Sequence, residues 1–393
     1  MAPPPYRIAY VDTAADEGGA EKSLLELTAR LDREQFTPLL LHTQGAEWLQ
    51  REPSDHLEKV PVFSPGGFLE RKRGALGGVL GNLRDLLASS RPVYRVLRGL
   101  RRHGADLVHT NALKAHLLGG LAARLAHLPL VWHMRDLLAE GEGLGLIRHA
   151  AAFLRPRVIA ISAAVGAQFE GLPVEVSLIH NGIPLEDFAP ASPPASLREE
   201  LGLAAGEPVV CCVGRLTPWK GHRNLLRAFA RVVQQQPRAR LLVVGEVAFW
   251  ADEYEQELHD LAGSLGLGDR VLWTGFRSDV PDLLRLCDLL VLPSHNEPFG
   301  RVLIEAMSVG KPVVATNGGG APEIVVPEET GLLVPLNGPE QLAESLLRLL
   351  EDEPLRIRMG QAGQRRAAEC FDVRRVVGQV QELYREMLGA RAG

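Results

Sequence analysis

Short apolar runs alternate with amphipathic stretches along almost the whole chain. Most of these runs lack polar alternation, which is typical of parallel strands that are covered on both faces. They predict twelve strands, at residues 6–12, 37–43, 106–111, 129–135, 157–162, 176–182, 208–216, 239–246, 270–276, 288–294, 311–317 and 331–336. The amphipathic stretches between them predict helices, among them 221–236, 252–265 and 299–309.

The regular alternation of strands and helices predicts doubly wound α/β sheets, and twelve strands are too many for one such sheet. Pro, Ala and Ser cluster in "LEDFAPASPPASLREE" (185–200), between two equal sets of strands, and mark a linker. We therefore predict two α/β domains of similar size that face a cleft. Ligands of such sheets bind beyond the carboxyl ends of strands, so functional residues are expected directly after them.

Composition narrows the class of protein. Of 393 residues, 46% are hydrophobic and 23% are charged, as in soluble globular proteins, and the net charge of −5 argues against a general nucleic-acid binder. The start, "MAPPPYRIAY", lacks the pattern of a signal peptide, and Arg124, His127 and Pro129 interrupt the most apolar long window. The four cysteines show no metal spacing and fit reduced thiols, so we expect a cytoplasmic protein.

Two cations occur where the predicted strand 208–216 runs into the loop "GRLTPWKG". Arg215 and Lys220 would lie just before a helix N-terminus. The helix dipole and its free N–H groups would add to their charge, so the pair is a natural clamp for a diphosphate. A solvated loop with ordinary surface charges is the alternative.

Two glutamates follow the predicted strand 288–294, in "SHNEPFGRVLIEAM" (294–307). With helical geometry throughout, Glu297 and Glu305 would be separated by roughly 12 Å along the axis, which exceeds the roughly 5–9.5 Å of paired glycosidase carboxylates. The spacing suits two hydroxyl-rich groups joined by a diphosphate, with Glu305 on a ribose and Glu297 on a sugar. Alternatively, Glu305 is buried against an arginine and Glu297 caps the helix.

Other unusual residues stand in the same strand-end position. "NGGGAPEIV" after strand 311–317 and "DEGGAEKSLLELTARL" after strand 6–12 contain glycines that let a backbone approach a ligand, or merely form flexible turns. "VWHMRD" ends strand 129–135 with His133 and Arg135. A lone histidine is more often a satisfied polar residue than a catalytic one, although its strand-end position favours function.

Together these motifs resemble the family-4 retaining glycosyltransferases of the GT-B fold (glycosyltransferase group 1). The resemblance covers nearly the whole chain, and its motifs occur in the family's order: "GGAE" (18–21), "DLVHTN" (106–111), "VWHMRD" (131–136), "VIAIS" (158–162), "IHNGIPLEDF" (179–188), "VGRLTPWKG" (213–221), "LLVVGE" (241–246) and residues 271–325 with the glutamate pair. It implies two Rossmann-like domains, 1–187 for the acceptor and 188–372 for the donor, with a helix over 373–393 that crosses back.

The resemblance also implies a role for each matching residue. Arg215 and Lys220 would hold the diphosphate of a nucleotide-sugar donor, and His133 would lie near the reacting centre of the sugar. Glu305 would bind the ribose and Glu297 the transferred sugar. The remaining donor contacts, several of them through the backbone, would come from Gly18, Gly19, Phe276, Arg277, Phe299, Gly300, Gly318 and Gly319.

The mechanism that the resemblance implies is retaining transfer without a cofactor or an essential metal. No Asp-x-Asp stands at a strand end, and no carboxylate is placed as a covalent nucleophile, so we favour front-face attack. Two alternatives stay open: a nucleotide-sugar 2-epimerase of the same fold, and a catalytically silent nucleotide-sugar-binding or scaffold protein. The acceptor, whether a glycan, a lipid-linked or a small molecule, is not identified.

One stretch hints at a membrane partner. Residues 66–104 carry nine Lys or Arg against two acids, mixed with leucines. A basic amphipathic stretch is typical of a site for an anionic acceptor or for peripheral attachment to an anionic membrane. The alternative is a solvated cationic helix face whose leucines pack into the first domain.

Overall fold

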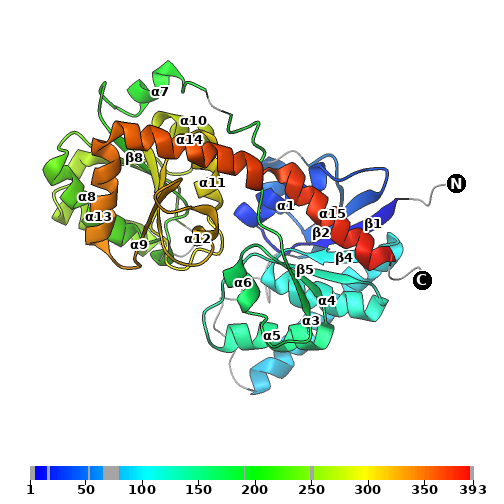
Figure 1. Ribbon diagram of the computed structural model, residues 1–393. Coiled ribbons are helices and arrows are strands. Elements are labelled where there is room, and N and C mark those ends of the chain that lie inside the picture. The colour runs from blue at the N-terminus through cyan, green and yellow to red at the C-terminus, as the bar shows by residue number, and fades with distance from the viewer. Residues whose placement is uncertain are drawn as a thin grey trace. The chain divides into compact units, whose positions relative to one another are not determined.

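The computed structural model describes residues 5–15, 18–51, 54–64, 79–189, 191–247 and 252–389, without the side chains of 51, 79–89, 142 and 252. The chain forms two compact units, residues 1–182 together with 373–393, and residues 183–372. Each unit is a Rossmann-like parallel sheet with helices packed on it (Figure 1). Residues 183–187 group with the second unit, and the C-terminal helix groups with the first.

The sheet of the first unit has seven parallel strands. Their order across the sheet is β3 (Glu58–Phe63), β2 (Phe36–Thr43), β1 (Tyr6–Val11), β4 (Leu107–Thr110), β5 (Leu130–Met134), β6 (Arg157–Ala160) and β7 (Glu175–Leu178). The strand order reverses between β1 and β4, where Tyr10 pairs with His109 in register. In such sheets this reversal opens a crevice at the carboxyl ends of the strands.

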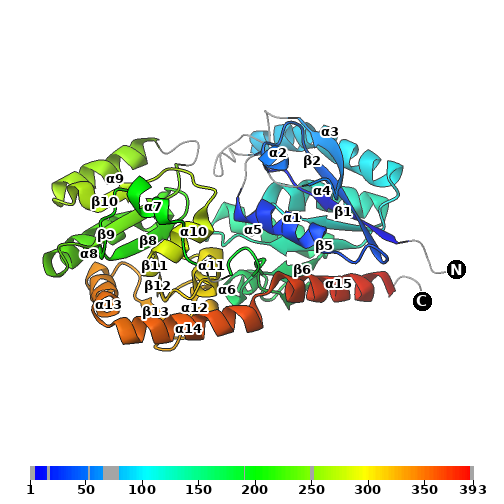
Figure 2. The same ribbon diagram turned by 90° about the horizontal axis from the view of Figure 1, so that it is seen from above.

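Helices cover both faces of this sheet. They are α1 (Gly19–Ala29), α2 (Trp48–Arg51), α3 (Val79–Arg102), α4 (Leu113–Ala126), α5 (Glu142–Leu154), α6 (Ala163–Ala167) and α15 (Val373–Gly389). Apolar side chains of α1 and α15 share one core cluster with β1 and β2, whereas α3 and α4 contact each other beside β3 and β4. Figure 2 shows α15, the last helix of the chain, running beside this sheet.

The sheet of the second unit has six parallel strands. Their order is β10 (Val271–Trp273), β9 (Arg240–Val244), β8 (Val209–Val213), β11 (Leu289–Leu292), β12 (Val313–Thr316) and β13 (Gly331–Val334). The order reverses between β8 and β11. The helices of this unit are α7 (Ala195–Glu200), α8 (His222–Gln235), α9 (Asp252–Ser264), α10 (Val280–Leu286), α11 (Arg301–Ser308), α12 (Ala321–Ile324), α13 (Pro339–Glu351) and α14 (Glu353–Cys370), with 3-10 turns at Pro218–Lys220 and Gly268–Arg270.

All twelve predicted strands are present, and a thirteenth, β3, was missed by the sequence prediction. Its sequence "EKVPVF" begins with two exposed charged residues and contains Pro61, which argues against a central strand. Proline is tolerated at a sheet edge, where its missing N–H faces no neighbour. The register of β3 against β2 also shifts at this point, because Thr43 pairs with Phe63 after His42 has paired with Pro61.

The C-terminal helix α15 joins the first unit through a tight backbone crossing. A Cβ atom at Gly182 would lie 2.6 Å from the Cα of Val373, so only glycine fits where the chain leaves this unit and later returns to it. Val376, Val380 and Tyr384 of α15 are buried in the same core cluster as Ile8 and Tyr10 of β1. The return of the helix therefore completes the core of the first unit.

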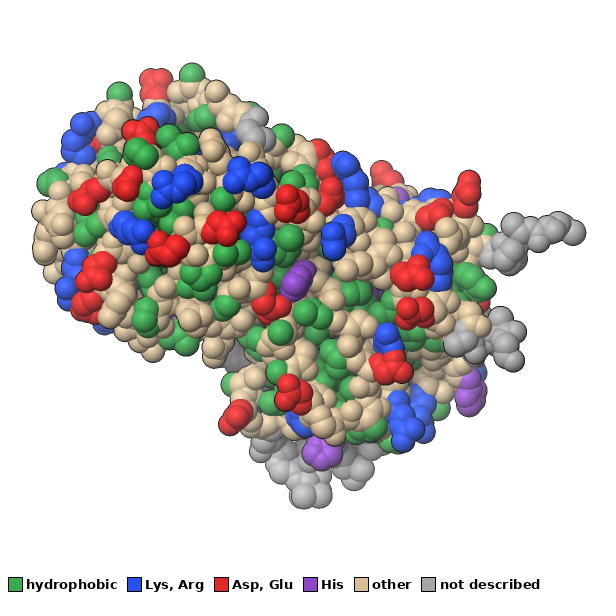
Figure 3. Space-filling view, in the orientation of Figure 1, with side chains coloured by type: hydrophobic (Ala, Val, Ile, Leu, Met, Phe, Trp, Pro, Cys, Tyr) green, Lys and Arg blue, Asp and Glu red, His purple; other side chains and the backbone are tan. Residues whose placement is uncertain are grey.

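The surface carries charges of both signs. On the face drawn in Figure 3, Lys and Arg side chains alternate with Asp and Glu over the second unit. Within the part of the chain that the structure describes, no helix is long and apolar enough to cross a membrane. The four cysteines are free, and Cys211, Cys212 and Cys287 are buried.

Candidate active site

Three loops at the carboxyl ends of β8, β11 and β12 interlock in the second unit. A Cβ at Gly221 (φ 77°) would lie 2.0 Å from the carbonyl oxygen of Pro293, and one at Gly319 (φ 59°) would lie 2.0 Å from that of Glu297. The amide of Gly320 donates to the same Glu297 oxygen at 2.8 Å. Glycine is required at both crossings because of positive φ and of the close backbone. The loops that the sequence marked as glycine-rich therefore hold one another in place.

An ion pair between Lys220 and Glu297 joins the first two of these loops. Nζ of Lys220 donates to Oε2 of Glu297 at 2.8 Å, and the exposed fractions of the two side chains are 16% and 11%. The ammonium group also lies 4.4 Å from the ring centroid of Trp219. An ammonium has three N–H donors, so this contact leaves Lys220 able to bind another oxygen atom.

Arg215 differs from Lys220 in its surroundings. It is exposed in the loop after β8, and it forms no ion pair with the residues that the structure describes. Gly214 beside it (φ 153°) packs against Gly245 at the end of β9, where a Cβ would lie 2.2 Å from the Gly214 carbonyl oxygen. The backbone that carries Arg215 is thus fixed, while its charge faces solvent.

Glu305 is buried on α11 and pairs with Arg301 one turn earlier, at 3.0 Å between Nε and Oε1. Arg301 is thus the arginine that the alternative, purely structural interpretation of Glu305 requires. The same interpretation has Glu297 capping the helix, and that is wrong, because α11 starts at Arg301 after Gly300 without a side-chain cap. Gly300 has φ 102°, and the segment before it is a turn, so the helical separation of the glutamates does not apply.

The other predicted donor-binding residues of this unit lie around these loops. Phe299 is buried and packs edge-to-face on Phe371. The amide of Gly318 already donates a hydrogen bond within the protein, to the carbonyl oxygen of Thr316 at 2.9 Å. The amide of Gly319 donates to no backbone carbonyl of the described residues.

Phe276 and Arg277 stand beyond the end of β10. The Phe276 ring is 57% exposed. The Arg277 guanidinium donates two hydrogen bonds to Asp279 and one to Glu200, and these carboxylates raise its pKa. Since the Arg277 side chain is already occupied, the backbone of the segment and the exposed Phe276 ring are the parts available to a ligand.

In the first unit, Gly18 and Gly19 lie at the start of α1. Gly18 is the N-cap residue, and its carbonyl accepts from the Lys22 amide at 3.1 Å. A Cβ at Gly19 would meet no atom within 4 Å, and no positive φ is recorded there. The described residues therefore give no steric reason for glycine at position 19.

His133 lies on β5 with only 3% of its surface exposed. Its Nδ1 contacts Nε2 of His109 at 3.2 Å and Nη2 of Arg135 at 3.3 Å. Its Nε2 is buried and has no hydrogen-bond partner among the described residues. Burial lowers the pKa of His133 well below its ordinary value, and the charge of Arg135 lowers it further.

Sequence reasoning missed a set of buried polar residues around Arg135. Nε of Arg135 donates to Asn111 at 2.7 Å, and Nη1 donates to Asn181 at 2.6 Å. Asn111 in turn donates to Asp12 at 2.9 Å. Burial raises the pKa of the Asp12 carboxyl group, and this effect exceeds the lowering of the pKa by its hydrogen bonds. Asp12 and Asn111 directly follow β1 and β4, so the strand-end rule could have found them.

The basic stretch 66–104 is described in part. Residues 65–78 lie outside the described residues, whereas 79–102 form α3. In its second half Val96 and Leu100 are buried. The exposed residues of that half are Arg91, Tyr94, Arg95, Arg98, Arg101 and Arg102. Here the apolar residues pack inward, as the solvated-face interpretation expects.

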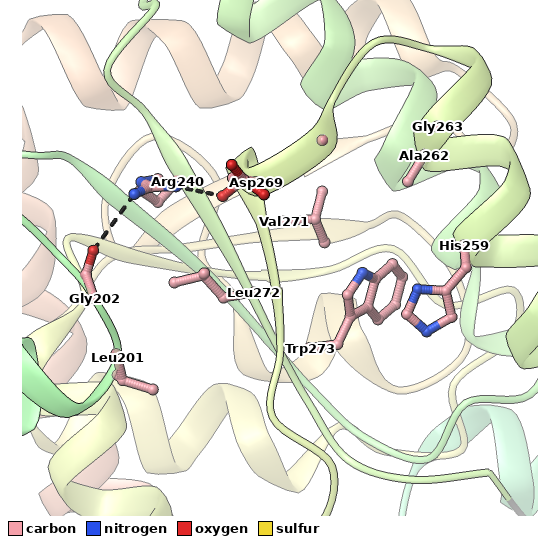
Figure 4. A pocket seen from close by; sticks show the side chains of 11 residues that line it. Leu201, Gly202, Arg240, His259, Ala262, Gly263, Asp269, Val271, Leu272 and Trp273 are labelled. Carbon is pink, nitrogen blue, oxygen red and sulfur yellow. Dashed lines mark hydrogen bonds between the residues drawn. The ribbon is translucent and has the colours of Figure 1, made fainter.

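Figure 4 shows a pocket elsewhere in the second unit, of about 620 Å³. Arg240 at the start of β9 and all of β10 line the pocket, so it lies beside the edge strand of this sheet. The Arg240 side chain is committed to Gly202, Glu207 and Asp269, and Trp273 packs on His259 with ring centroids 4.6 Å apart. None of the residues that line the pocket belongs to the glycine-rich loops after β8, β11 and β12.

Comparisons with known proteins agree with this geometry. Residues 195–366 match the family model described as glycosyl transferases group 1, and residues 17–187 match glycosyltransferase family 4. HepE from Anabaena, solved in complex with UDP-glucose, is 30% identical with a TM-score of 0.82, over 97% of this chain and 99% of that chain. Sucrose-phosphate synthase from Thermosynechococcus elongatus is 25% identical with a TM-score of 0.81, over 98% and 100%.

Sequence relatives lead to the same family. The D-inositol 3-phosphate glycosyltransferase of Kineococcus radiotolerans is 30% identical over 96% of this chain and 92% of its own length. The UDP-Gal:alpha-D-GlcNAc-diphosphoundecaprenol alpha-1,3-galactosyltransferase of Escherichia coli is 28% identical over 77% and 81%. Fold and site thus define a glycosyltransferase with two Rossmann-like domains. The chain belongs to the family-4 (group 1) glycosyltransferases of the GT-B fold.

Proposed function

We propose that this glycosyltransferase transfers a sugar from a nucleoside-diphosphate sugar to a hydroxyl group, with retention of anomeric configuration and without an essential metal. The observation that carries the proposal is the placement of Arg215, Lys220 and Glu297 on interlocked loops at the carboxyl ends of β8 and β11. Ligands of doubly wound sheets bind at such a point of strand reversal.

A UDP-sugar is the donor that we propose first, because HepE was solved with UDP and with UDP-glucose. Arg215 offers an exposed cation, and Lys220 has N–H groups left after its contact with Glu297. Both would bind the diphosphate, Glu305 the ribose and Glu297 the sugar. Gly19, which meets no steric contact among the described residues, would allow the diphosphate to approach α1.

The proposed chemistry is front-face attack. The bond between the sugar and the diphosphate breaks, and a departing phosphate oxygen accepts the proton of the attacking hydroxyl group. Preorganised cations at Arg215 and Lys220 would stabilise the charge that develops on the diphosphate. Among the described residues, no group of three or more His, Cys, Asp or Glu side chains is arranged to hold a metal ion.

The acceptor and two alternative functions stay open. Relatives act on a phosphorylated inositol and on a lipid-linked sugar, judged by their names, so small-molecule, glycan and lipid-linked acceptors all belong in a screen. A silent nucleotide-sugar-binding protein would bind donors without turning them over. A 2-epimerase of the same fold would instead change the configuration of the donor sugar at C2.

A donor screen tests the proposal. We expect a UDP-sugar to raise the melting temperature and to release UDP slowly by hydrolysis, and faster with the right acceptor, with the product anomer retained. A chelator should leave most of this activity intact, because Arg215 and Lys220 neutralise the leaving group. Binding without nucleotide release, an epimerised sugar, an inverted anomer or activity that only added manganese restores would each contradict a part of the proposal.

We also propose weak peripheral attachment to anionic membranes through α3. Arg91, Arg95, Arg98 and Arg102 recur at intervals of three or four residues and therefore share one helix face, beside Tyr94 with 63% of its surface exposed. None of these arginines forms an ion pair with a carboxylate among the described residues. Arginines that have no ion-pair partner among the described residues, around an exposed aromatic ring, suit a surface of anionic headgroups.

Vesicle binding tests this attachment. Binding to phosphatidylserine vesicles should be detectable at 10 mM salt and should fall at physiological salt, where the Debye length shrinks from about 30 Å to about 8 Å. R91E/R98E should abolish it. The control R227E/R358E makes the same charge change on exposed helix positions of the second unit and should bind like the parent. Equal losses in the two variants, or no binding at low salt, would leave α3 a solvated face.

A further inference from the structure

A chain of hydrogen bonds runs through the interior of the first unit and ends at His133. The hydroxyl groups of Tyr10 and Tyr384 lie 3.0 Å apart, and the Tyr384 hydroxyl lies 2.6 Å from Nδ1 of His109. Nε2 of His109 lies 3.2 Å from Nδ1 of His133. Three of these residues stand on adjacent strands, whereas Tyr384 comes from the C-terminal helix α15.

Arg135 fixes the direction of these hydrogen bonds. Its Nη2 lies 3.3 Å from Nδ1 of His133, and a guanidinium group can only donate. Nδ1 of His133 therefore carries a lone pair, and a neutral ring then has its proton on Nε2. Because His109 faces the same lone pair, His109 must donate through Nε2 and keep its own lone pair on Nδ1.

The remaining two bonds follow from this assignment. The lone pair on Nδ1 of His109 accepts from the Tyr384 hydroxyl, and the Tyr384 oxygen in turn accepts from Tyr10. Burial lowers the pKa of both histidines well below the ordinary value, and Arg135 acts in the same direction, so both rings are neutral at pH 7. Each hydrogen bond of the chain thus points toward His133.

We propose that Arg135, and Tyr384 acting through His109, are positioning residues that hold His133 as its Nε2–H tautomer, which donates a hydrogen bond to an oxygen atom of the substrate. Nε2 of His133 is buried and has no partner among the described residues, and a buried donor without a partner is costly. A sugar hydroxyl or phosphate oxygen of the donor would satisfy it. This last step rests on the proposed function, whereas the tautomer does not.

The same contacts exclude His133 as a general base. Nε2 already carries the ring proton, and Nδ1 already accepts from Arg135 and from His109. The ring therefore has no lone pair for the proton of an attacking hydroxyl group. This agrees with a reaction in which the departing phosphate oxygen takes that proton.

The tautomer is measured directly on the full chain. In 15N-histidine-labelled protein without substrate, His133 should show a protonated Nε2 and an unprotonated Nδ1 at neutral pH, with its signals assigned by their loss in H133Q. A protonated Nδ1 or a charged ring would overturn the proposal. Since no substrate is present, this result is independent of whether the proposed function is right.

Two pairs of variants test the consequences for transfer. H133Q can keep an amide N–H near Nε2 and should retain kcat within roughly tenfold, whereas H133F should lose roughly a hundredfold. Equal losses in H133Q and H133F would overturn the role as donor, because a base is lost in both. Their melting temperatures are compared alongside.

The second pair removes one hydroxyl group at a time, from Tyr384 inside the hydrogen-bond chain or from Tyr10 at its far end. Y384F deprives His109 of its donor and should lower kcat roughly threefold to tenfold, with KM for the donor unchanged and a new population of His109 protonated on Nδ1. Y10F leaves the Tyr384 proton in place and should stay within about twofold of the parent. The two changes are chemically identical and equally buried. Equal effects on kcat and on the 15N signals would overturn the proposed direction.

Discussion

We expect K220A to lower the rate of sugar transfer at least tenfold and also to lower thermal stability, whereas R215A lowers the rate alone. Each change would remove one of the proposed charge-assisted contacts with the diphosphate, worth roughly 1.5–3 kcal/mol, or a factor of about 10 to 150 in rate. The stability difference comes from Glu297, whose carboxylate is nearly buried and loses its cation in K220A. Arg215 is exposed and leaves no buried group behind.

The unpaired Glu297 carboxylate in K220A should cost about 1–3 kcal/mol, or several degrees in melting temperature. The double variant K220A/E297Q should regain most of that stability, because it no longer carries the buried charge of Glu297. It should not regain transfer, because the cation of Lys220 is still missing. R227A is the matched control for R215A, as another exposed arginine of this unit. Parent-like kinetics in both R215A and K220A would refute the diphosphate assignment, and unchanged stability in K220A would refute the importance of the ion pair.

The second large effect separates the two glutamates. E305Q should raise KM for the donor roughly threefold to tenfold with little change in kcat, since a ribose contact is equally strong in the ground and transition states. E297Q should lower kcat tenfold or more, because a carboxylate beside the sugar favours the positive charge that develops as the diphosphate leaves. Product anomers should stay retained in both variants, because neither residue is proposed as the nucleophile.

Binding of free UDP provides the control for this pair. E305Q should weaken UDP binding, measured by calorimetry, whereas E297Q should not. Each glutamate loses one partner in the protein, Arg301 for Glu305 and Lys220 for Glu297, so melting temperatures must be recorded for both. If E297Q acts on UDP affinity and E305Q acts on kcat, the ribose and sugar assignments have to be exchanged.

The fold was largely predictable because its strands are buried on both faces. Such strands must be apolar throughout, and this left twelve continuous apolar runs in the sequence. The edge strand Glu58–Phe63 escaped prediction for the opposite reason, since an edge tolerates proline and solvent-facing charges. The positions of Arg215, Lys220, Glu297 and Glu305 after strands were also visible, because strand ends are local features of the chain.

The contact between Lys220 and Glu297 was not predictable, unlike the local pair of Arg301 and Glu305. Lys220 and Glu297 are 77 residues apart, and their contact depends on β8 and β11 being neighbours in the sheet. The alternative that Glu297 caps the helix stayed open from the sequence, and the start of α11 at Arg301 after Gly300 excludes it. An ion pair of this kind depends on the order of the strands in the sheet, and no single segment of the sequence determines that order.

The sequence by itself determined the two parallel sheets, the glycine-rich loops and the candidate residues at strand ends, because burial on both faces and tight turns constrain residue types locally. Only the tertiary structure decided which groups meet. It brought Tyr384, 275 residues along the chain, onto His109, and it placed the guanidinium of Arg135 on one nitrogen of His133. Hydrogen-bond direction depends on which donor faces which lone pair, and that is settled by packing between elements that are distant in sequence.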